Sequence, residues 1–361
     1  MSCYHPLKAF PVGVNPSGKP AYKVTSYSVG SVYQLDRDSS WFCSAESFVP
    51  GVYRCVSNSI EIPCGKCVGC RLDYSRQWAD RCMLELQDHD SAYFLTLTYN
   101  DFAVPRSYYP DPETGEAQVS LTLRKKDWQD FMKRLRYYRP DDHLRFFMCG
   151  EYGPNTFRPH YHAIVFGLHL DDLVPFSRST QGYQYYTSKT VSRAWSSRGT
   201  IKDLFGEDCV TPLAEMGHIL VGDVSWETCA YTARYIMKKL KGPEAQFYSD
   251  FNLEPPFVLM SRMPGIGRKY FDDHPDIYDF ASINIKTPQG GRKIRPPRYY
   301  DKLFDLEYPE RMAEIKETRK RMAEARRALK LEKTSLNYLD YLAVEEAAKI
   351  NAISSLQRKE F

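Results

Sequence analysis

Two apolar segments joined by a short loop constrain the fold of this chain more than any other feature. HLRFFMCGEYG (143–153) and PHYHAIVFGL (159–168) are separated only by PNTFR (154–158). A loop of this length joins neighbouring antiparallel strands. SAYFLTLTYND (91–101) alternates apolar and polar residues with a period of two, and GHILVGDV (217–224) is a further strand candidate. The chain is therefore expected to contain a central antiparallel sheet.

Amphipathic segments around these strands predict the helices that flank the sheet. RLDYSRQWADRCMLELQDH (71–89) and RKKDWQDFMKRLRYY (124–138) carry apolar residues at helical spacing. SWETCAYTARYIMKKLKG (225–242) has the same spacing and ends at Gly242-Pro243, a helix stop signal. Because helices interleave with strands that pair as a hairpin, the predicted fold class is α+β.

The two ends of the chain differ in composition from its middle. Residues 1–62 are rich in Pro, Gly, Ser and Tyr, which predicts an irregular N-terminal region with a few strands. ERMAEIKETRKRMAEARRALKLEK (310–333) holds nine Lys or Arg against five acids and predicts a long charged helix. We therefore expect a central α+β domain over 63–300, with a cysteine cluster at its start, followed by a charged helical tail over 301–361.

Positive charge gathers in particular segments, although the formal net charge is only +4. Residues 124–139 hold seven Lys or Arg against two Asp, and residues 286–298 hold five and no acid. Aromatic residues make up 14% of the chain. Cations for phosphates and flat rings for unstacked bases suit a protein that binds single strands. A solvated basic surface explains the same pattern, so charge alone does not decide between the two.

The sequence contains no segment typical of export or of membrane insertion. The start, MSCYHPLKAF, lacks the apolar stretch of a signal peptide, and no later run approaches the about 18 apolar residues of a membrane span. The ten cysteines lack the density of a small disulfide scaffold. We expect an intracellular, soluble protein.

His160 and His162 are the first candidates for chemistry. Residues i and i+2 of a strand point to the same face, so both imidazoles can reach one cation. Glu151 ends the preceding strand, and the short loop lets it fold back near His160. Two imidazoles and a carboxylate suit Mg²⁺, Mn²⁺ or Zn²⁺ and leave coordination positions open. The alternatives are structural or surface histidines and a solvated turn carboxylate.

The predicted helix over 225–242 places two tyrosines on one side. Tyr231 and Tyr235 are an i, i+4 pair, with Lys238 one turn beyond and Lys239 close by. They lie opposite an apolar stripe of Cys229, Ala233, Ile236, Met237 and Leu240. A phenol oxygen can attack a phosphodiester, and nearby cations favour its phenolate form. The alternative is an exposed ladder of side chains without a function.

Cys64, Cys67 and Cys70 form a C-x2-C-x2-C pattern. Tetrahedral zinc takes four ligands, and Cys55 and Cys82 are the candidates for the fourth. The alternative is a cysteine-rich turn that caps the following helix. The spacing does not choose between them.

Three of these motifs resemble those of HUH endonucleases. HYH (160–162) resembles their His-hydrophobic-His metal motif, and FLTLTY (94–99) resembles their first strand motif. YTARYIMKK (231–239) resembles the two-tyrosine motif of superfamily members that replicate single-stranded phage DNA. Combined with PCGKCVGCR (63–71) and SRMPGIG (261–267), the pattern is most similar to the replication initiators of gokushovirus-type microviruses.

The resemblance, which spans about residues 60–270, implies a rolling-circle replication initiator. Such a protein nicks the origin of phage replicative-form DNA by tyrosine attack, stays linked to the 5′ phosphate and leaves a 3′-OH primer. It later rejoins the displaced strand into a single-stranded circle. The resemblance assigns Tyr231 and Tyr235 as nucleophiles and His160 and His162 as ligands of Mg²⁺ or Mn²⁺. Glu151 is the implied third ligand, for which His143 and His169 are the substitutes in the neighbouring sequence.

The same resemblance implies the partners and the setting. The expected substrate is single-stranded or melted origin DNA in the cytoplasm of a bacterial host. The chain has no Walker motif, so a host helicase and a host polymerase would complete replication. Two other functions remain open at this point. One is a non-catalytic nucleic-acid-binding protein with structural metals, and the other is a metallohydrolase that activates water.

Overall fold

The chain forms two compact units in the computed structural model. One unit comprises residues 1–74 and 304–361, and the other comprises residues 75–303. Tyr235, Lys238 and Lys239 lie outside the described residues. The described residues are 3–16, 18–153, 156–179, 182–198, 200–202, 208–210, 213–234, 245–287 and 290–356.

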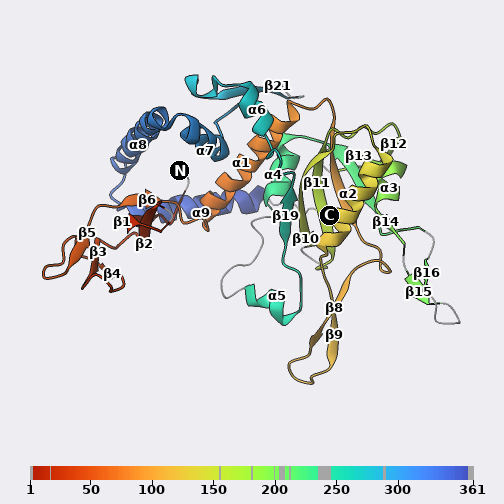
Figure 1. Ribbon diagram of the computed structural model, residues 1–361, viewed down its shortest axis with the longest axis horizontal. Coiled ribbons are helices and arrows are strands. Elements are labelled where there is room, and N and C mark those ends of the chain that lie inside the picture. The colour runs from red at the N-terminus through yellow and green to blue at the C-terminus, as the bar shows by residue number, and fades with distance from the viewer. Residues whose placement is uncertain are drawn as a thin grey trace. The chain divides into compact units, whose positions relative to one another are not determined.

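A seven-stranded antiparallel sheet forms the centre of the unit 75–303 (Figure 1). The two apolar segments with the short loop form its adjacent strands β10 and β11, which confirms the expected hairpin and the α+β class. In spatial order the strands are β12 (Leu173–Arg178), β13 (Gln184–Ser188), β18 (Ile219–Asp223), β7 (Ala92–Thr98), β11 (Pro159–Phe166), β10 (Arg145–Tyr152) and β19 (Phe257–Met260).

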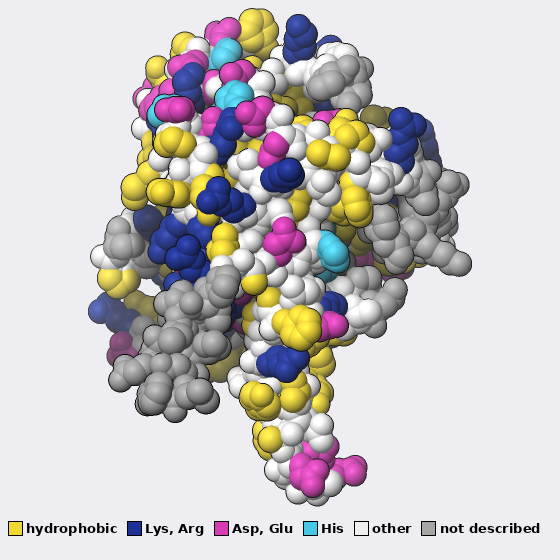
Figure 2. All heavy atoms as spheres, turned by 90° about the vertical axis from the view of Figure 1, so that its right-hand side faces the viewer, with side chains coloured by type: hydrophobic (Ala, Val, Ile, Leu, Met, Phe, Trp, Pro, Cys, Tyr) yellow, Lys and Arg dark blue, Asp and Glu magenta, His cyan; other side chains and the backbone are white. Residues whose placement is uncertain are grey.

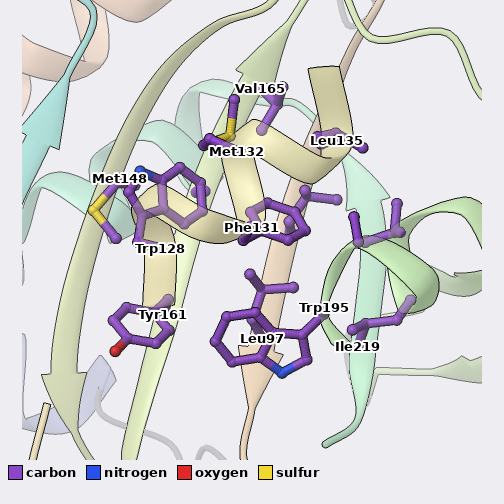
Figure 3. Packing of buried hydrophobic residues seen from close by; sticks show 14 of the residues in the cluster. Leu97, Trp128, Phe131, Met132, Leu135, Met148, Tyr161, Val165, Trp195 and Ile219 are labelled. Carbon is purple, nitrogen blue, oxygen red and sulfur yellow. The ribbon is translucent and has the colours of Figure 1, made fainter. Parts of the chain in front are cut away.

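Helix α2 (Lys125–Tyr138) covers one face of this sheet. Trp128, Phe131 and Leu135 follow each other at spacings of three and four, so they line one side of the helix. Figure 3 shows them packed with Leu97 from the sheet and Trp195 from the segment after α3 (Lys189–Ala194). Each of these side chains is at most 1% exposed, and burying one contributes about 1.5–3 kcal/mol.

Side-chain alternation along β11 gives its two faces different roles. Tyr161 lies in the core beneath α2 (Figure 3). His160 and His162 therefore point to the opposite face of the sheet. Helix α4 (Trp226–Arg234) contacts β10 and β11 and lies against that face.

Several smaller elements surround the sheet. The hairpin β8–β9 projects from it in Figure 1, and its tip, DPETGE (111–116), is acidic, as the magenta side chains at the lower end of Figure 2 show. The bounds are β8 (Arg106–Pro110), β9 (Ala117–Leu121), β14 (Ser196–Ser197), β15 (Thr200–Lys202), β16 (Asp208–Val210), β17 (Ala214–Glu215), α5 (Gln246–Asp250), α6 (Arg268–Asp273), a 3-10 helix (Ile277–Asp279), β20 (Ile283–Thr287) and β21 (Gly290–Ile294).

The unit formed by the two chain ends contains two small sheets and two long helices. The expected charged helix is α8 (Pro309–Leu331), and a second helix, α9 (Tyr338–Leu356), follows it. Asn337 starts α9 because its side-chain oxygen accepts a hydrogen bond from the Asp340 N–H at 3.0 Å. The strands are β1 (Leu7–Val14), β2 (Pro20–Ser26), β3 (Ser31–Gln34), β4 (Phe42–Ser44), β5 (Arg54–Val56) and β6 (Ile60–Ile62).

Two further helices cross the boundaries between the units along the chain. They are α1 (Val68–Leu86) and α7 (Arg298–Glu307). Among the described residues, no helix has an apolar stretch of the length that crossing a membrane requires.

Candidate active site

The register of β10 and β11 brings the three predicted ligands together. Glu151 pairs with His160 across the two strands, and His162 lies two residues further on the same face. One carboxylate oxygen, Glu151 Oε1, lies 3.0 Å from His160 Nε2 and 3.2 Å from His162 Nε2. One potential ligand atom from each residue lies within 4.8 Å of the other two. The expected substitute His169 lies elsewhere, bound to Asp142.

The other ring nitrogen of each histidine has a fixed partner. His160 Nδ1 donates a hydrogen bond to the Arg158 carbonyl oxygen at 3.1 Å. His162 Nδ1 lies 3.0 Å from the Thr96 hydroxyl oxygen, and Thr96 is the residue that faces His162 across β7 and β11. These contacts fix both rings with Nε2 directed at the carboxylate. Metal-binding histidines are oriented in this way by a partner at their second nitrogen.

Burial and charge make Glu151 an ionised ligand candidate. The residue is 2% exposed. Burial raises its pKa, but hydrogen bonds from His160 and His162 outweigh this effect and lower the pKa to about 2. The carboxylate therefore carries a full negative charge at neutral pH. Two imidazoles with one buried carboxylate form a donor set that fits a divalent cation.

Tyr231 lies beside this group. Its ring centroid is 5.1 Å from that of His162, with an angle of 78° between the rings. Phe94 of β7 stacks on the same imidazole, with its centroid 5.6 Å from that of His162 and the planes 10° apart. The HYH strand and the tyrosine helix therefore meet, as the sequence hypothesis requires for Tyr231. Tyr235, Lys238 and Lys239 lie outside the described residues.

Helix α4 is held in place at its start and along its buried side. Ser225 and Thr228 cap it reciprocally, since each side-chain oxygen accepts a hydrogen bond from the backbone N–H of the other residue. Trp226 Nε1 donates to Asp80 at 2.9 Å, and the Ser75 hydroxyl of α1 donates to the Ala230 carbonyl at 2.8 Å. These bonds keep the side that carries Tyr231 turned towards the sheet.

Sequence reasoning did not single out Thr96 and Phe94, although it noted the motif FLTLTY. The signal was present, because alternation along this strand places residues 94, 96 and 98 on one face. Tyr161, the middle residue of HYH, has a structural role. Its hydroxyl donates to the Arg124 carbonyl at 3.0 Å and lies 2.8 Å from the Tyr99 hydroxyl.

The cysteine group has a different fourth member from those expected. Cys64, Cys67 and Cys70 lie together with Cys3. Cys55 lies on β5, opposite Tyr33 of β3, and is not part of the group. Cys82 is buried within α1. The expectation that Cys55 or Cys82 completes the group is therefore corrected to Cys3, which no local spacing indicates.

Comparison with known proteins gives a consistent result. Residues 92–240, which contain all the histidine and tyrosine candidates, match the family model for the phage replication-associated protein ORF2. The chain is 29% identical to replication-associated protein VP4 of Bdellovibrio phage phiMH2K, over 71% of each chain. It is 27% identical to replication-associated protein ORF4 of Chlamydia phage 1, over 52% of this chain and 41% of that one. No solved structure matches the chain.

Another relative matches along nearly the whole length. The chain is 30% identical to replication-associated protein ORF2 of Spiroplasma virus 4, over 99% of this chain and 98% of that protein. The alignment thus covers both compact units and the site described above. The chain belongs to the replication-associated protein family of microvirus-type bacteriophages.

Proposed function

We propose that this protein is a metal-dependent DNA endonuclease and strand transferase that starts rolling-circle replication. The observation that supports this most directly is the contact of Tyr231 with His162, whose ring also faces the Glu151 carboxylate. A nucleophile and a cation-binding group meet there on one side of the sheet. Because the relatives are phage replication-associated proteins, the proposed substrate is the origin of replicative-form DNA in the bacterial cytoplasm.

The proposed site divides the work among a few side chains. A divalent cation such as Mg²⁺ or Mn²⁺, held by Glu151, His160 and His162, would withdraw negative charge from the non-bridging oxygens of a phosphodiester. Thr96 keeps His162 oriented, and the Arg158 carbonyl does the same for His160. This preorganisation means that little rearrangement is needed when the phosphate arrives.

Strand cleavage in this proposal exchanges one phosphate ester for another. The Tyr231 oxygen bonds to phosphorus as the bond from phosphorus to the 3′ oxygen breaks. The phenol loses its proton, and the leaving 3′ oxygen gains one. The products are a 5′-phosphotyrosine link and a free 3′-OH that a host polymerase can extend, while a host helicase unwinds the duplex. Since the energy of the ester bond is kept, the reverse reaction can rejoin the displaced strand into a circle.

Tyr235 is the proposed second nucleophile, four residues further along the sequence. Lys238 and Lys239 would favour the phenolate form of either tyrosine, because a phenol has an ordinary pKa of about 10. One tyrosine would hold the first 5′ end while the other attacks the regenerated junction. These three roles rest on the sequence motif alone.

A labelled single-stranded origin oligonucleotide, incubated with the protein and Mn²⁺ and run on a denaturing gel, tests the proposal. The expected result is a covalent protein–DNA adduct. Cleavage without an adduct would favour a water-activating hydrolase, and a shift seen only on a native gel would favour a non-catalytic binder. Both outcomes contradict the proposal.

Tyrosine variants test the assignment of the nucleophile. Replacing both Tyr231 and Tyr235 by Phe should abolish the adduct and leave DNA affinity nearly unchanged. Tyr137→Phe is the matched control, since Tyr137 is an exposed tyrosine of α2, and it should keep the adduct. An adduct formed by the double variant would exclude these two residues as nucleophiles.

A further inference from the structure

Four cysteine sulfur atoms converge in the unit formed by the chain ends. Cys3, Cys64, Cys67 and Cys70 each place Sγ within 4.8 Å of the other three. Two of these separations, from Cys64 to Cys70 and from Cys67 to Cys3, are 4.0 Å. Four thiolates at the Zn–S distance of about 2.3 Å lie about 3.8 Å apart at the corners of a tetrahedron. The observed spacing is close to that arrangement.

The backbone around the group is shaped to stabilise thiolates. The N–H groups of Tyr4 and Cys70 donate to Cys67 Sγ at 3.3 and 3.4 Å. The Cys67 N–H donates to Cys64 Sγ at 3.3 Å. The turn between these two cysteines needs Gly65, whose φ is +73°, a conformation that other residues rarely adopt. Such N–H donors favour the charged form of sulfur, which is the form that binds metal.

Paired disulfides do not explain the arrangement. A disulfide bond is about 2.05 Å long, whereas both close pairs here are 4.0 Å apart. All of these cysteines are free thiols in the structure. Two disulfides would also need only two separate pairs, and here every sulfur lies near all three others.

We propose that Cys3, Cys64, Cys67 and Cys70 bind one structural zinc ion. Four protein ligands close the coordination sphere of zinc, so the site would have no position for a substrate. Cys3 and Cys64 are 61 residues apart, and the ion would close this long loop. It would fix the start of the chain to the turn that precedes α1. The proposal is independent of the nicking reaction.

The position of the group within its unit fits a structural role. Cys67 directly precedes α1, whose first N–H, that of Val68, donates to the Glu346 carboxylate of α9 at 3.3 Å. The same carboxylate lies 2.5 Å from His5 Nε2. The first residues of the chain, the start of α1 and helix α9 therefore meet beside the cysteines, where a cross-link would stabilise several segments together.

Zinc content should be measured in a His160→Ala, His162→Ala variant, so that the candidate active site cannot contribute metal. Protein purified under reducing conditions should contain one zinc ion per chain. After replacement by Co²⁺, its absorption spectrum should show sulfur-to-cobalt charge transfer and the intense visible bands of a tetrahedral tetrathiolate site. A metal-free protein, or a cobalt spectrum without thiolate charge transfer, would overturn the proposal without any variant at the cysteines.

Two serine variants then identify the fourth ligand. Cys3→Ser should weaken zinc binding by more than the about 10–100-fold that changes beyond the ligands cause. Cys55→Ser is the matched control and should bind zinc as the parent does, since Cys55 lies outside the group. Loss of zinc from Cys55→Ser but not from Cys3→Ser would refute the assignment.

Discussion

The two groups of candidate ligands in this protein are built in opposite ways. Glu151, His160 and His162 come from adjacent strands of a sheet and are oriented by neighbouring strand residues. The cysteine group comes from the start of the chain and from a turn, and backbone N–H groups surround its sulfurs. The first group is set by strand register, and the second by a long-range closure of the chain.

This difference in construction matches a difference in chemistry. Three donors on a rigid sheet leave coordination positions for a phosphate, and a nucleophile stands beside them. Four thiolates leave none, so their ion can only stabilise the fold. The comparison therefore assigns reactivity to the histidine group and stability to the cysteine group.

The largest expected effect is the loss of nicking when both histidines are removed. His160→Ala with His162→Ala should lower the nicking rate by on the order of 10⁴-fold, because several kcal/mol of charge stabilisation are lost. Zinc content and DNA affinity should stay near those of the parent. Initial rates on a labelled origin oligonucleotide with Mn²⁺ give the measurement. Parental nicking by this variant would contradict the comparison at its reactive side.

The second effect concerns stability. At zinc concentrations about 1,000 times the Kd, binding contributes about 4 kcal/mol to the folded state. Removing zinc with a chelator should therefore lower the thermal midpoint of the parent, whereas Cys64→Ser should be destabilised already and insensitive to the chelator. Thermal unfolding followed by circular dichroism measures both. Equal midpoints with and without zinc would remove the stabilising role.

A buried carboxylate without a metal-type geometry provides a control for Glu151. Glu85 accepts hydrogen bonds from the Gly267 N–H at 2.6 Å and from Arg145, and it lies 3.3 Å from His89 Nε2. Burial raises its pKa, but the bonds from His89, Gly267 and Arg145 lower it below the ordinary value. The ionised form is thus stabilised in the folded protein.

Glu85→Gln should cost about 3 kcal/mol at neutral pH, because it leaves Arg145 without its buried partner. A lowered folded-state pKa gives stability above the unfolded value of about 4.3, and this is lost as the pH falls through the folded value. The difference from the parent should therefore shrink in acid. Urea unfolding from pH 7 down to pH 3 checks this, with Mn²⁺ expected to change nothing. A pH-independent difference would show that the charge is not responsible.

The smallest effect concerns the residue that orients a ligand. Thr96→Val removes the hydroxyl beside His162 Nδ1 and should weaken Mn²⁺ affinity by about 10–100-fold. Saturating Mn²⁺ should restore the rate. Thr98→Val is the matched control, because the Thr98 hydroxyl donates to the His218 carbonyl oxygen rather than to a histidine ring of the site. Equal Mn²⁺ titration curves for the two variants would contradict the orienting role.

Short-range patterns predicted the elements around the histidine group well. The helix expected over 124–138 is α2, Lys125–Tyr138, and the expected hairpin is β10–β11. The short loop left little freedom in strand register, so Glu151 could be placed beside His160 from the sequence. Alternation along β11 then fixed His162 on the same face.

Long-range features could not be predicted in the same way. Cys3 is 61 residues from Cys64, and no spacing within C-x2-C-x2-C points to it. Cys55 is nearer in sequence, yet the pairing of β5 with β3 takes it elsewhere. Helix α9 was missed because its start depends on one capping residue, Asn337, within a polar turn.

The alternation of β11 also couples the inside of the protein to its reactive side. Tyr161 belongs to the same three-residue stretch as both imidazoles, and its hydroxyl is held by Arg124 and Tyr99 beneath α2. Any loosening of these bonds would let the strand twist and would misdirect the histidines. The protein thus cannot soften its interior without impairing its chemistry, and this strand has to satisfy both demands with every residue it accepts.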